Sequence, residues 1–300
     1  MSLPIAYAAI IFIWATTPLA VKWSAVDAGF IFAVLSRMTI AAVLCQIIII
    51  ALRSKWEWHK RALSMYLLSG FNIFFSMLLI YWGALTISSG LIALLFGLMP
   101  IITGVFATLI LKEKSFTPQK LLGIGIAFSG LMIIFYTSTA GDAQYALATT
   151  AVLAAIIWHS FSTVVFKRFA SDLPVFSLTT GSIWVSVFFL ATFWLITDGK
   201  FPATISTLGW SSILYLSTIA SVIGFTVYFY ILKRIEASKI ALIPLITPVM
   251  ALLLGQYLNG EQPDTRVWGG TFLILSGLSF YQFGSYFTKL LIRISERATH

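Results

Sequence analysis

The sequence predicts an all-α membrane protein whose ten transmembrane helices form two inverted five-helix repeats. Three observations predict this fold class: an apolar composition, a series of long apolar segments, and a motif that occurs twice. Of the 300 residues, 59% are hydrophobic and only 10% are charged, and the mean hydropathy is +0.97. An ordinary soluble domain carries about 25% charged residues. The chain therefore lacks the polar residues that a water-facing surface requires.

Ten apolar segments approach the length of about 20 residues that crosses a bilayer as a helix. Lipid offers no partner to backbone N–H and C=O groups, and the alternation typical of barrel strands is absent, so each segment should be helical. The first segment lacks a basic head and a cleavage site, which predicts a retained helix and not a signal peptide. In chain order the segments are residues 4–22, 30–52, 63–85, 89–111, 118–137, 147–166, 174–197, 209–232, 238–258 and 267–289.

The basic residues are distributed unevenly between the loops. If the N-terminus is cytoplasmic, 15 of the 19 Lys and Arg residues lie on the cytoplasmic side and 3 lie in the outer loops. Cytoplasmic loops carry such an excess, so we expect a multi-pass protein of the cell inner (plasma) membrane with both termini cytoplasmic. The basic residues then indicate topology and contact with anionic lipids. A nucleic-acid partner would need a soluble basic domain, which is not evident.

One pattern of proline and glutamate occurs twice, 148 residues apart. Pro100 and Pro248 are each followed thirteen residues later by a glutamate, Glu113 and Glu261. Each copy continues with two glycines seven residues apart and begins with a tryptophan and a lysine in its first segment. The matched residues are Trp14 and Lys22 with Trp158 and Lys167, and Gly123 and Gly130 with Gly270 and Gly277.

Each copy contains five segments, and an odd number means that the second copy enters the membrane from the opposite side. We therefore expect two related halves, residues 1–140 and 141–300, within one integral membrane unit. Inverted repeats recur in secondary transporters, whose binding site lies near the midplane between the halves. Structural ancestry without a functional consequence is the alternative interpretation.

These features together resemble the EamA-type branch of the drug/metabolite transporter superfamily. The features are the ten-segment layout, the paired P-x12-E elements before a glycine-rich fifth helix, and the tryptophan in the first helix of each half. The resemblance covers nearly the whole chain. It implies a solute carrier of the bacterial inner membrane, commonly an exporter of amino acids or related metabolites, and it does not identify the substrate.

Ionisable residues inside a bilayer are unfavourable, and those that occur there are candidates for function. Arg37, about 10 Å below the outer surface at 1.5 Å per residue, and His159, at mid-depth, are the two that lie deep within the segments and not at their ends. The Arg37 guanidinium could bind a substrate carboxylate in a bidentate pair, or extend toward lipid phosphate. His159 could titrate or donate to a ligand, or be a satisfied interior histidine.

Aromatic and polar side chains occur at matching depths of the first and sixth segments. Trp14 and Thr17 lie in the first, and Trp158 precedes His159 in the sixth. We expect these residues to line a pseudo-symmetric cavity, with ordinary packing as the alternative. Asn72 in the third segment and Tyr228 in the eighth are weaker candidates for the same cavity.

Small polar residues precede Tyr228 at helical spacing in the eighth segment. They are Ser217, Ser221 and Gly224, and such a stripe either permits close helix packing or lines water. We expect these residues to serve packing. The glycines of the fifth and tenth segments are likewise expected to permit close contact between helices.

Each repeat places a proline within a segment and a glutamate at its end. Pro100 and Pro248 remove backbone hydrogen bonds, so they could act as hinges or give the bundle a static bend. Glu113 and Glu261 end their segments, where the helix dipole opposes a negative charge. We expect compensating cations that fix the loops, Arg266 in the case of Glu261, with a gating role second.

These observations favour a secondary transporter that moves small metabolites, amino acids or related amphoteric solutes above all, by alternating access. The P-loop motif for ATP is absent, so transport would be passive or ion-coupled. A passive uniporter or channel is the alternative. An intramembrane lipid-modifying enzyme is a distant third, because the expected acid/base and metal constellations are missing. We expect no catalysis, no cofactor, no metal, and a monomer or homodimer in contact with lipids and a small-molecule substrate.

Overall fold

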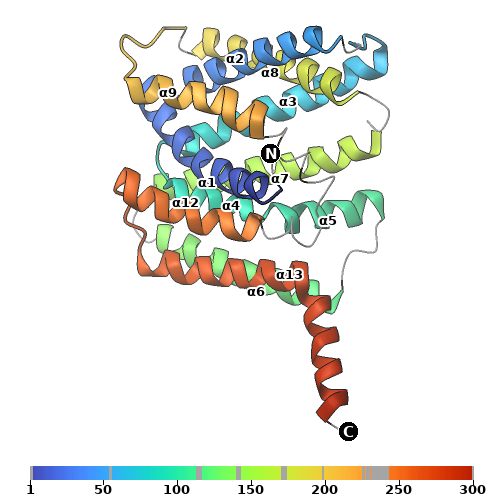
Figure 1. Cartoon of the computed structure of the whole chain (residues 1–300). Helices are drawn as coiled ribbons and strands as arrows, with labels where there is room; N and C mark the ends of the chain where they lie inside the picture. Colours follow the sequence, from blue (N-terminus) through green and yellow to red (C-terminus); the bar gives the residue numbers. More distant parts are fainter. Residues whose placement is uncertain are drawn as a thin grey trace.

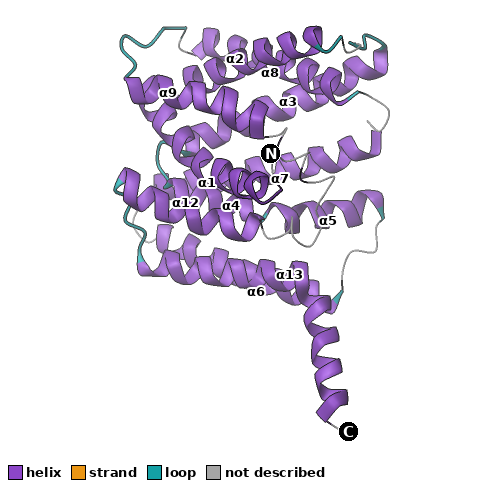
Figure 2. Cartoon of the chain, viewed as in Figure 1, coloured by secondary structure: helices purple, strands orange, loops and turns teal. Residues whose placement is uncertain are grey.

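The computed structural model describes residues 3–53, 56–112, 117–139, 143–169, 174–197, 199–224, 227, 231 and 243–298. Every regular element in these ranges is helical, which confirms the all-α part of the predicted fold class (Figure 2). Each predicted segment coincides with one described helix or two consecutive ones. The elements are α1 (Leu3–Ala28), α2 (Phe30–Ala51), α3 (Lys60–Gly83), α4 (Ser89–Gly97), α5 (Met99–Leu111), α6 (Pro118–Thr139), α7 (Ala143–Phe169), α8 (Val175–Thr197), α9 (Thr207–Tyr215), the π-helix η1 (Leu216–Ile223), α12 (Ile243–Asn259) and α13 (Thr265–Ala298).

The described helices have the length and surface of a membrane bundle. Six spans are long and apolar enough to cross a bilayer, with α4 and α5 counted as one, and three shorter apolar helices accompany them. Large apolar side chains such as Phe188, Ile196 and Phe272 are exposed on the outside. A water-soluble monomer rarely exposes such extensive apolar surface, so lipid is the environment that this exterior suits.

The segment predicted as one helix over residues 89–111 is divided in two. Helix α4 ends at Gly97, α5 begins at Met99, and Pro100 lies in the first turn of α5. Proline has no N–H to donate to the preceding turn, and its ring favours the start of a helix over its interior. Pro248, by contrast, lies inside a continuous α12. The two matched prolines therefore act differently on their helices.

Helices α6 and α13 pack closely through glycine pairs. A Cβ atom on Gly123 would lie 2.6 Å from the carbonyl oxygen of Gly277, and one on Gly130 would lie 2.6 Å from that of Gly270. Distances below 3.0 Å to backbone atoms leave no room for a side chain, which explains the glycines. Residue numbers increase along α6 in the direction in which they decrease along α13, so the two helices run antiparallel.

Helices α4 and α12 also run antiparallel. Gly90 lies against Leu252, and Gly97 lies against Pro244 and Pro248. The break between α4 and α5 therefore lies beside the proline-containing part of α12. Both antiparallel pairs join helices that the sequence assigns to equivalent positions in the two repeats.

The bundle is layered, with α2 and α8 along one side and α6 and α13 along the other (Figure 1). Between these layers, α1 packs against α9, η1 and α12, and α7 packs against α3 and α5. Helices from the first half of the chain thus pack against helices from the second half. The C-terminal end of α13 projects from the bundle (Figure 1).

Short turns connect several helices. Gly29 alone separates α1 from α2, and its φ of 76° lies in the left-handed region that glycine adopts without strain. The side chain of Ser88 accepts a hydrogen bond from the Leu91 N–H and caps α4. Ser206 caps α9 in the same way through the N–H of Gly209. These caps satisfy N–H groups that have no partner within the helix.

Candidate functional site

Arg37 lies within α2 and points into the bundle. The residue is only 7% exposed. Its Nη1 donates to the Tyr81 hydroxyl of α3 at 3.4 Å, and its Nη2 donates to the Ser221 hydroxyl of η1 at 3.5 Å. The buried Nε has no hydrogen-bond partner among the described residues. Both bonds are near the long limit for hydrogen bonding, so the guanidinium retains most of its capacity to donate.

Arg37 forms no ion pair with a carboxylate of the described residues, whereas Lys22 pairs with Glu261. A buried charge normally has a partner of opposite sign. The Tyr81 side chain is fully buried, and its hydroxyl accepts from Arg37 without a described acceptor for its own proton. The site therefore offers a cation and a neighbouring hydroxyl donor to an anionic group.

The π-helix η1 forms the third side of this site. Within it, the Ser221 hydroxyl donates to the carbonyl oxygen of Leu216, five residues earlier. Single π-helical turns are uncommon and occur frequently at functional sites. Ser221 was expected to serve packing, and its contact with Arg37 gives it a polar role instead. Sequence periodicity carries no signal for a π-helix.

Thr16 on α1 faces the junction between α9 and η1. Thr16 shares a hydrogen bond of 2.6 Å with the Tyr215 hydroxyl, and Thr17 donates to the carbonyl oxygen of Ile13 at 2.6 Å. Trp14 is half-buried and packs against both apolar clusters of the core. Tyr215 is the last residue of α9, directly before η1. Thr16 and Arg37 therefore contact the same α9–η1 segment, whereas the hydroxyl of the candidate Thr17 bonds within its own helix.

His159 and Asn72 form a second polar group, between α7 and α3. The Asn72 amide nitrogen lies 3.3 Å from His159 Nδ1. Ser76 donates to the Asn72 side-chain oxygen and to the Ala155 carbonyl oxygen, both at 3.3 Å. Asn72 and Tyr81 are both on α3, about 13 Å apart at 1.5 Å per residue. The two polar groups are therefore joined by one helix and separated by more than two of its turns.

Trp158 packs within a cluster of aromatic side chains. Its ring meets those of Phe71, Phe75 and Phe161 at centroid distances of 6.2, 5.6 and 5.9 Å. The indole Nε1 is buried without a hydrogen-bond partner among the described residues. The expectation that Trp158 lines one cavity with Arg37 stays a prediction, since these contacts fit packing equally well.

Glu261 was expected to pair with Arg266, and that expectation is wrong. Its carboxylate lies 3.7 Å from Lys22 Nζ, and both of its oxygens accept from the Ser89 N–H, at 3.0 and 3.1 Å. Arg266 instead lies beside the exposed Asp264, whose pKa is held below its ordinary value by the Thr265 hydroxyl first and by the N–H and charge of Arg266 among the smaller contributions. Lys22, the last residue of the first predicted segment, lies within α1.

Two candidates, Tyr228 and Glu113, lie outside the described residues. The remaining candidates for hinge or gate are Pro100, Pro248 and Glu261. Pro100 stands directly after the break between α4 and α5, and Glu261 follows α12 by two residues. A moving role for any of them stays a prediction.

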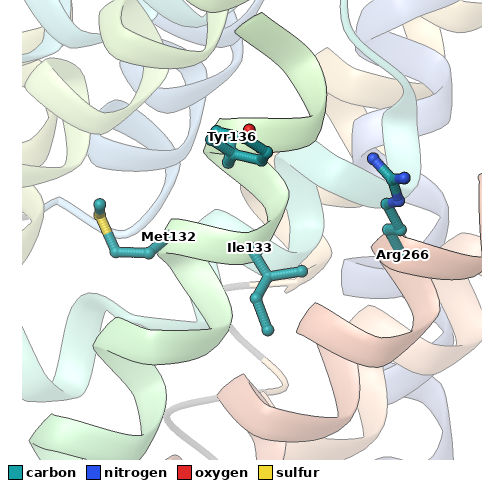
Figure 3. Close-up of a pocket in the computed structure, with 4 residues that line it drawn as sticks. All are labelled: Met132, Ile133, Tyr136 and Arg266. Carbon is teal, nitrogen blue, oxygen red and sulfur yellow. The ribbon is translucent and has the colours of Figure 1, made fainter. Parts of the chain in front are cut away.

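A shallow groove of about 380 Å³ lies elsewhere, on the outside of the α6–α13 layer (Figure 3). It is lined by Met132, Ile133 and Tyr136 of α6 and by Arg266 of α13. Its helices form the side of the bundle opposite α2, which carries Arg37 (Figure 1). The groove is open and mostly apolar, so it does not correspond to the expected central cavity.

Sequence reasoning missed three residues that contact the candidates. Tyr81 and Tyr215 are aromatic residues with hydroxyl groups inside apolar segments, and that combination was an available signal. The contact of Lys22 with Glu261 joins positions 239 residues apart. No local pattern indicates it, because both residues stand near helix ends, where charged residues are common.

Comparisons with known proteins agree with this architecture. The model for the EamA-like transporter family matches residues 3–136 and again residues 146–282. An uncharacterized transporter of Archaeoglobus fulgidus is 29% identical over 239 residues, which cover 77% of this chain and 80% of the relative. Protein PagO of Salmonella typhimurium is 26% identical over 271 residues, which cover 89% and 88%. A protein of known crystal structure aligns with a TM-score of 0.63 at 17% identity, covering 94% of this chain and 97% of its own, and shares the fold.

Proposed function

Because this chain belongs to the EamA-like transporter family, we propose that it is a secondary transporter that moves small metabolites across the inner membrane. Amino acids and related amphoteric solutes are the proposed substrates, and export is the proposed direction. The uneven distribution of basic residues between the loops supports a cytoplasmic position for both termini. Relatives named as transporters support the general activity.

The observation that carries the substrate class is the buried Arg37. Its guanidinium is 7% exposed and has hydroxyl partners but no described carboxylate. An unpaired ion inside a protein is unfavourable by several kcal/mol, so a bound anion stabilises this site. A substrate carboxylate can accept from the free Nε–H and from Arg37 Nη groups, and Tyr81 can donate a further hydrogen bond. Thr16, Tyr215 and Trp14 then lie on the neighbouring surface of α1 and α9.

Alternating access is the proposed mechanism, with residues 1–140 and 141–300 as inverted repeats. Two antiparallel pairs of equivalent helices, α6 with α13 and α4 with α12, support this duplication. An inverted repeat supplies two similar arrangements that can exchange, one open to each side of the membrane. The binding site would remain between them near the midplane.

The proposed moving bodies differ from the two halves of the sequence. Helix α1 packs with α9 and α12, whereas α7 packs with α3 and α5. If residues 1–140 moved as one block, both of these interfaces would have to separate. If instead the α1–α9–α12 group moves relative to the α3–α5–α7 group, the interfaces within each group stay intact. Arg37 stands on α2 and contacts Tyr81 of α3, a member of one group, and Ser221 of η1, the π-helix that follows α9 of the other group.

Transport by purified protein in liposomes tests this function. Vesicles are loaded with labelled amino acids, organic acids and amines, and efflux is measured with and without a pH gradient. We expect carboxylate-bearing solutes to be moved. Indifference to every solute would argue against a transporter. Efflux that depends on the pH gradient would identify proton coupling. Solute exchange that does not depend on the pH gradient would indicate a uniporter.

The inverted repeat is tested by the position of two loops. Reporter fusions after Glu113 and after Glu261 should report opposite faces of the membrane. The same face for both would refute the inverted arrangement, whatever the substrate. A channel, the second candidate, would show flux without accelerated exchange when solute is added to the opposite side.

A further inference from the structure

We propose that Glu261 is a releasable clasp that holds the short helix α4 closed against α1 and α12. This inference rests on the proposed alternating-access function. The clasp consists of Glu261, Lys22, Ser89 and Asn259. Release of the carboxylate would allow α4 to move about the break that precedes Pro100 and would open this end of the bundle.

The carboxylate of Glu261 is held from several directions. Its two oxygens accept the Ser89 N–H, and Oε2 also accepts the Ser89 hydroxyl at 3.0 Å. Oε1 accepts from the Asn259 amide at 3.0 Å and lies 3.7 Å from Lys22 Nζ. The Glu261 side chain is only 8% exposed. Gly255 lies against the carboxylate, where a side chain would collide with it.

These bonds connect separate parts of the bundle. Lys22 is on α1 and also donates to the carbonyl oxygen of Ile87 at 2.8 Å, directly before α4. Trp23, the next residue of α1, donates through its indole N–H to the Asn259 oxygen at 2.8 Å. Glu261 therefore joins the start of α4 to α1 and to the end of α12. A carboxylate at a helix N-terminus is favoured by the helix dipole.

Helix α4 can lose this contact without losing its own structure. Its cap is Ser88, whose hydroxyl accepts from Leu91 and does not bond to Glu261. After Ser89, the contacts of α4 with α12 are between apolar or small groups: Gly90 contacts Leu252, and Gly97 contacts Pro248. The polar bonds that hold α4 to α12, among the residues described, thus concentrate at Glu261. Water can replace the carboxylate at Ser89 when this end opens.

At the other end of α4 the regular helix is interrupted at Leu98, whose N–H bonds to the Leu95 carbonyl oxygen only three residues earlier. The helix ends at Gly97, and α5 starts anew at Met99 and packs against α7. Helix α4 is thus a nine-residue segment with the clasp at one end and a break at the other. A bond that only fixed a loop would have no such movable element beside it.

Cysteine labelling at position 252 tests the clasp. Leu252 is 1% exposed and packs against Gly90 between α12 and α4. In a Cys45→Ser background, Leu252→Cys in lipid nanodiscs is treated with a polar maleimide. Glu261→Gln should accelerate labelling by about tenfold, because the neutral amide replaces the charge-assisted hydrogen bonds of the closed arrangement with weaker ones. Ser89→Ala, which retains the N–H donor, should give a smaller increase.

Two controls separate a clasp from general destabilisation. Asp264→Asn removes a nearby exposed carboxylate outside the clasp and should leave labelling unchanged. A probe at Ala155→Cys, buried on α7, should react at the parental rate in Glu261→Gln. An unchanged rate at position 252 in both clasp variants, or equal acceleration at positions 155 and 252, overturns the proposal. The assay needs no solute, so a failure of the clasp and a failure of transport are observed separately.

Discussion

Lys22 and Arg37 are both cations on membrane-spanning helices, one on α1 and one on α2, but their surroundings differ. Lys22 is 18% exposed in its side chain, lies 3.7 Å from Glu261, and donates to the Ile87 carbonyl oxygen at 2.8 Å. Arg37 is more deeply buried and contacts only two hydroxyl groups, at 3.4 and 3.5 Å, among the described residues. The less buried cation thus has the stronger protein partners.

This difference separates a cation used by the fold from a cation left for a ligand. The charge of Lys22 is balanced within the chain, so its contribution should be to stability and to the closed end of the bundle. The charge of Arg37 has no balancing carboxylate among the described residues, and its contribution should be to binding. Depth in the membrane alone would have ranked both as functional candidates. The partners of each charge provide the better criterion.

The largest expected effect is on transport by Arg37→Ala. Removal of the guanidinium should lower the transport of a carboxylate-bearing solute by at least about 30-fold, because loss of one partner of a buried charge pair costs about 2–5 kcal/mol and 1.4 kcal/mol is tenfold. Neutral analogues without the carboxylate should be affected little. The measurement is initial efflux from liposomes for an amino acid and for its amide.

Arg37→Lys serves as the matched control because it retains the charge and loses the planar fork. It should transport at an intermediate rate. Equal loss of carboxylate-bearing and neutral solutes in Arg37→Ala would contradict the assignment of Arg37 to the carboxylate.

The next effect concerns the free energy of unfolding, to which Lys22 should contribute more than Arg37, the reverse of their expected contributions to transport. Lys22→Met should lower the free energy of unfolding by about 2 kcal/mol, because it leaves the buried Glu261 carboxylate without its cation. Arg37→Met should leave the free energy of unfolding unchanged or raise it, because it removes an unpaired buried charge. Thermal unfolding in detergent, without solute, compares the two variants.

The double variant Lys22→Met with Glu261→Gln should recover part of the stability lost in Lys22→Met. A neutral amide can still accept from Ser89 without requiring a cation. If Arg37→Met were the less stable of the two single variants, the comparison between a structural and a binding cation would fail.

A smaller effect is expected from Tyr81→Phe, which removes one hydroxyl beside Arg37. Loss of a single hydrogen bond to a ligand should weaken binding by about 1 kcal/mol, or about fivefold. The apparent affinity, obtained from the dependence of efflux on solute concentration, measures this weakening of binding. The hydroxyl of Tyr215 contacts Thr16 and not Arg37, so Tyr215→Phe is a control that should have less effect on carboxylate preference.

Much of the fold was predictable because lipid imposes simple rules on a sequence. The ten segments follow from length and apolarity, and the close approach of α6 and α13 follows from glycines spaced seven residues apart. The burial of Arg37 also follows from its position within an apolar segment. The inverted orientation of the two repeats stays a prediction, and it depends on the same pattern of glycines and prolines.

The partners of the charges could not be predicted in this way. Lys22, Ser89 and Glu261 meet because α1, α4 and α12 converge, and their spacing along the chain carries no trace of that convergence. The π-helix beside Arg37 depends on how η1 packs against α2, since local propensity favours an ordinary helix. Pro100 and Pro248 are equivalent in sequence, yet only the helix before Pro100 is broken.

The smallest effect should come from Ser221→Ala in η1. Ser221 donates to the Leu216 carbonyl oxygen and accepts a long bond from Arg37, so its removal frees one Arg37 nitrogen without removing charge. We expect about a twofold change in apparent affinity, at the low end for a single hydrogen bond. Ser217→Ala, which changes a serine that bonds to Ile213 on the same segment, controls for loss of a hydroxyl near the π-helix. If Ser221→Ala changed solute transport as much as Arg37→Ala does, then η1 and not the Arg37 charge would determine binding. The distinction between Arg37 as a binding cation and Lys22 as a structural cation would then be refuted.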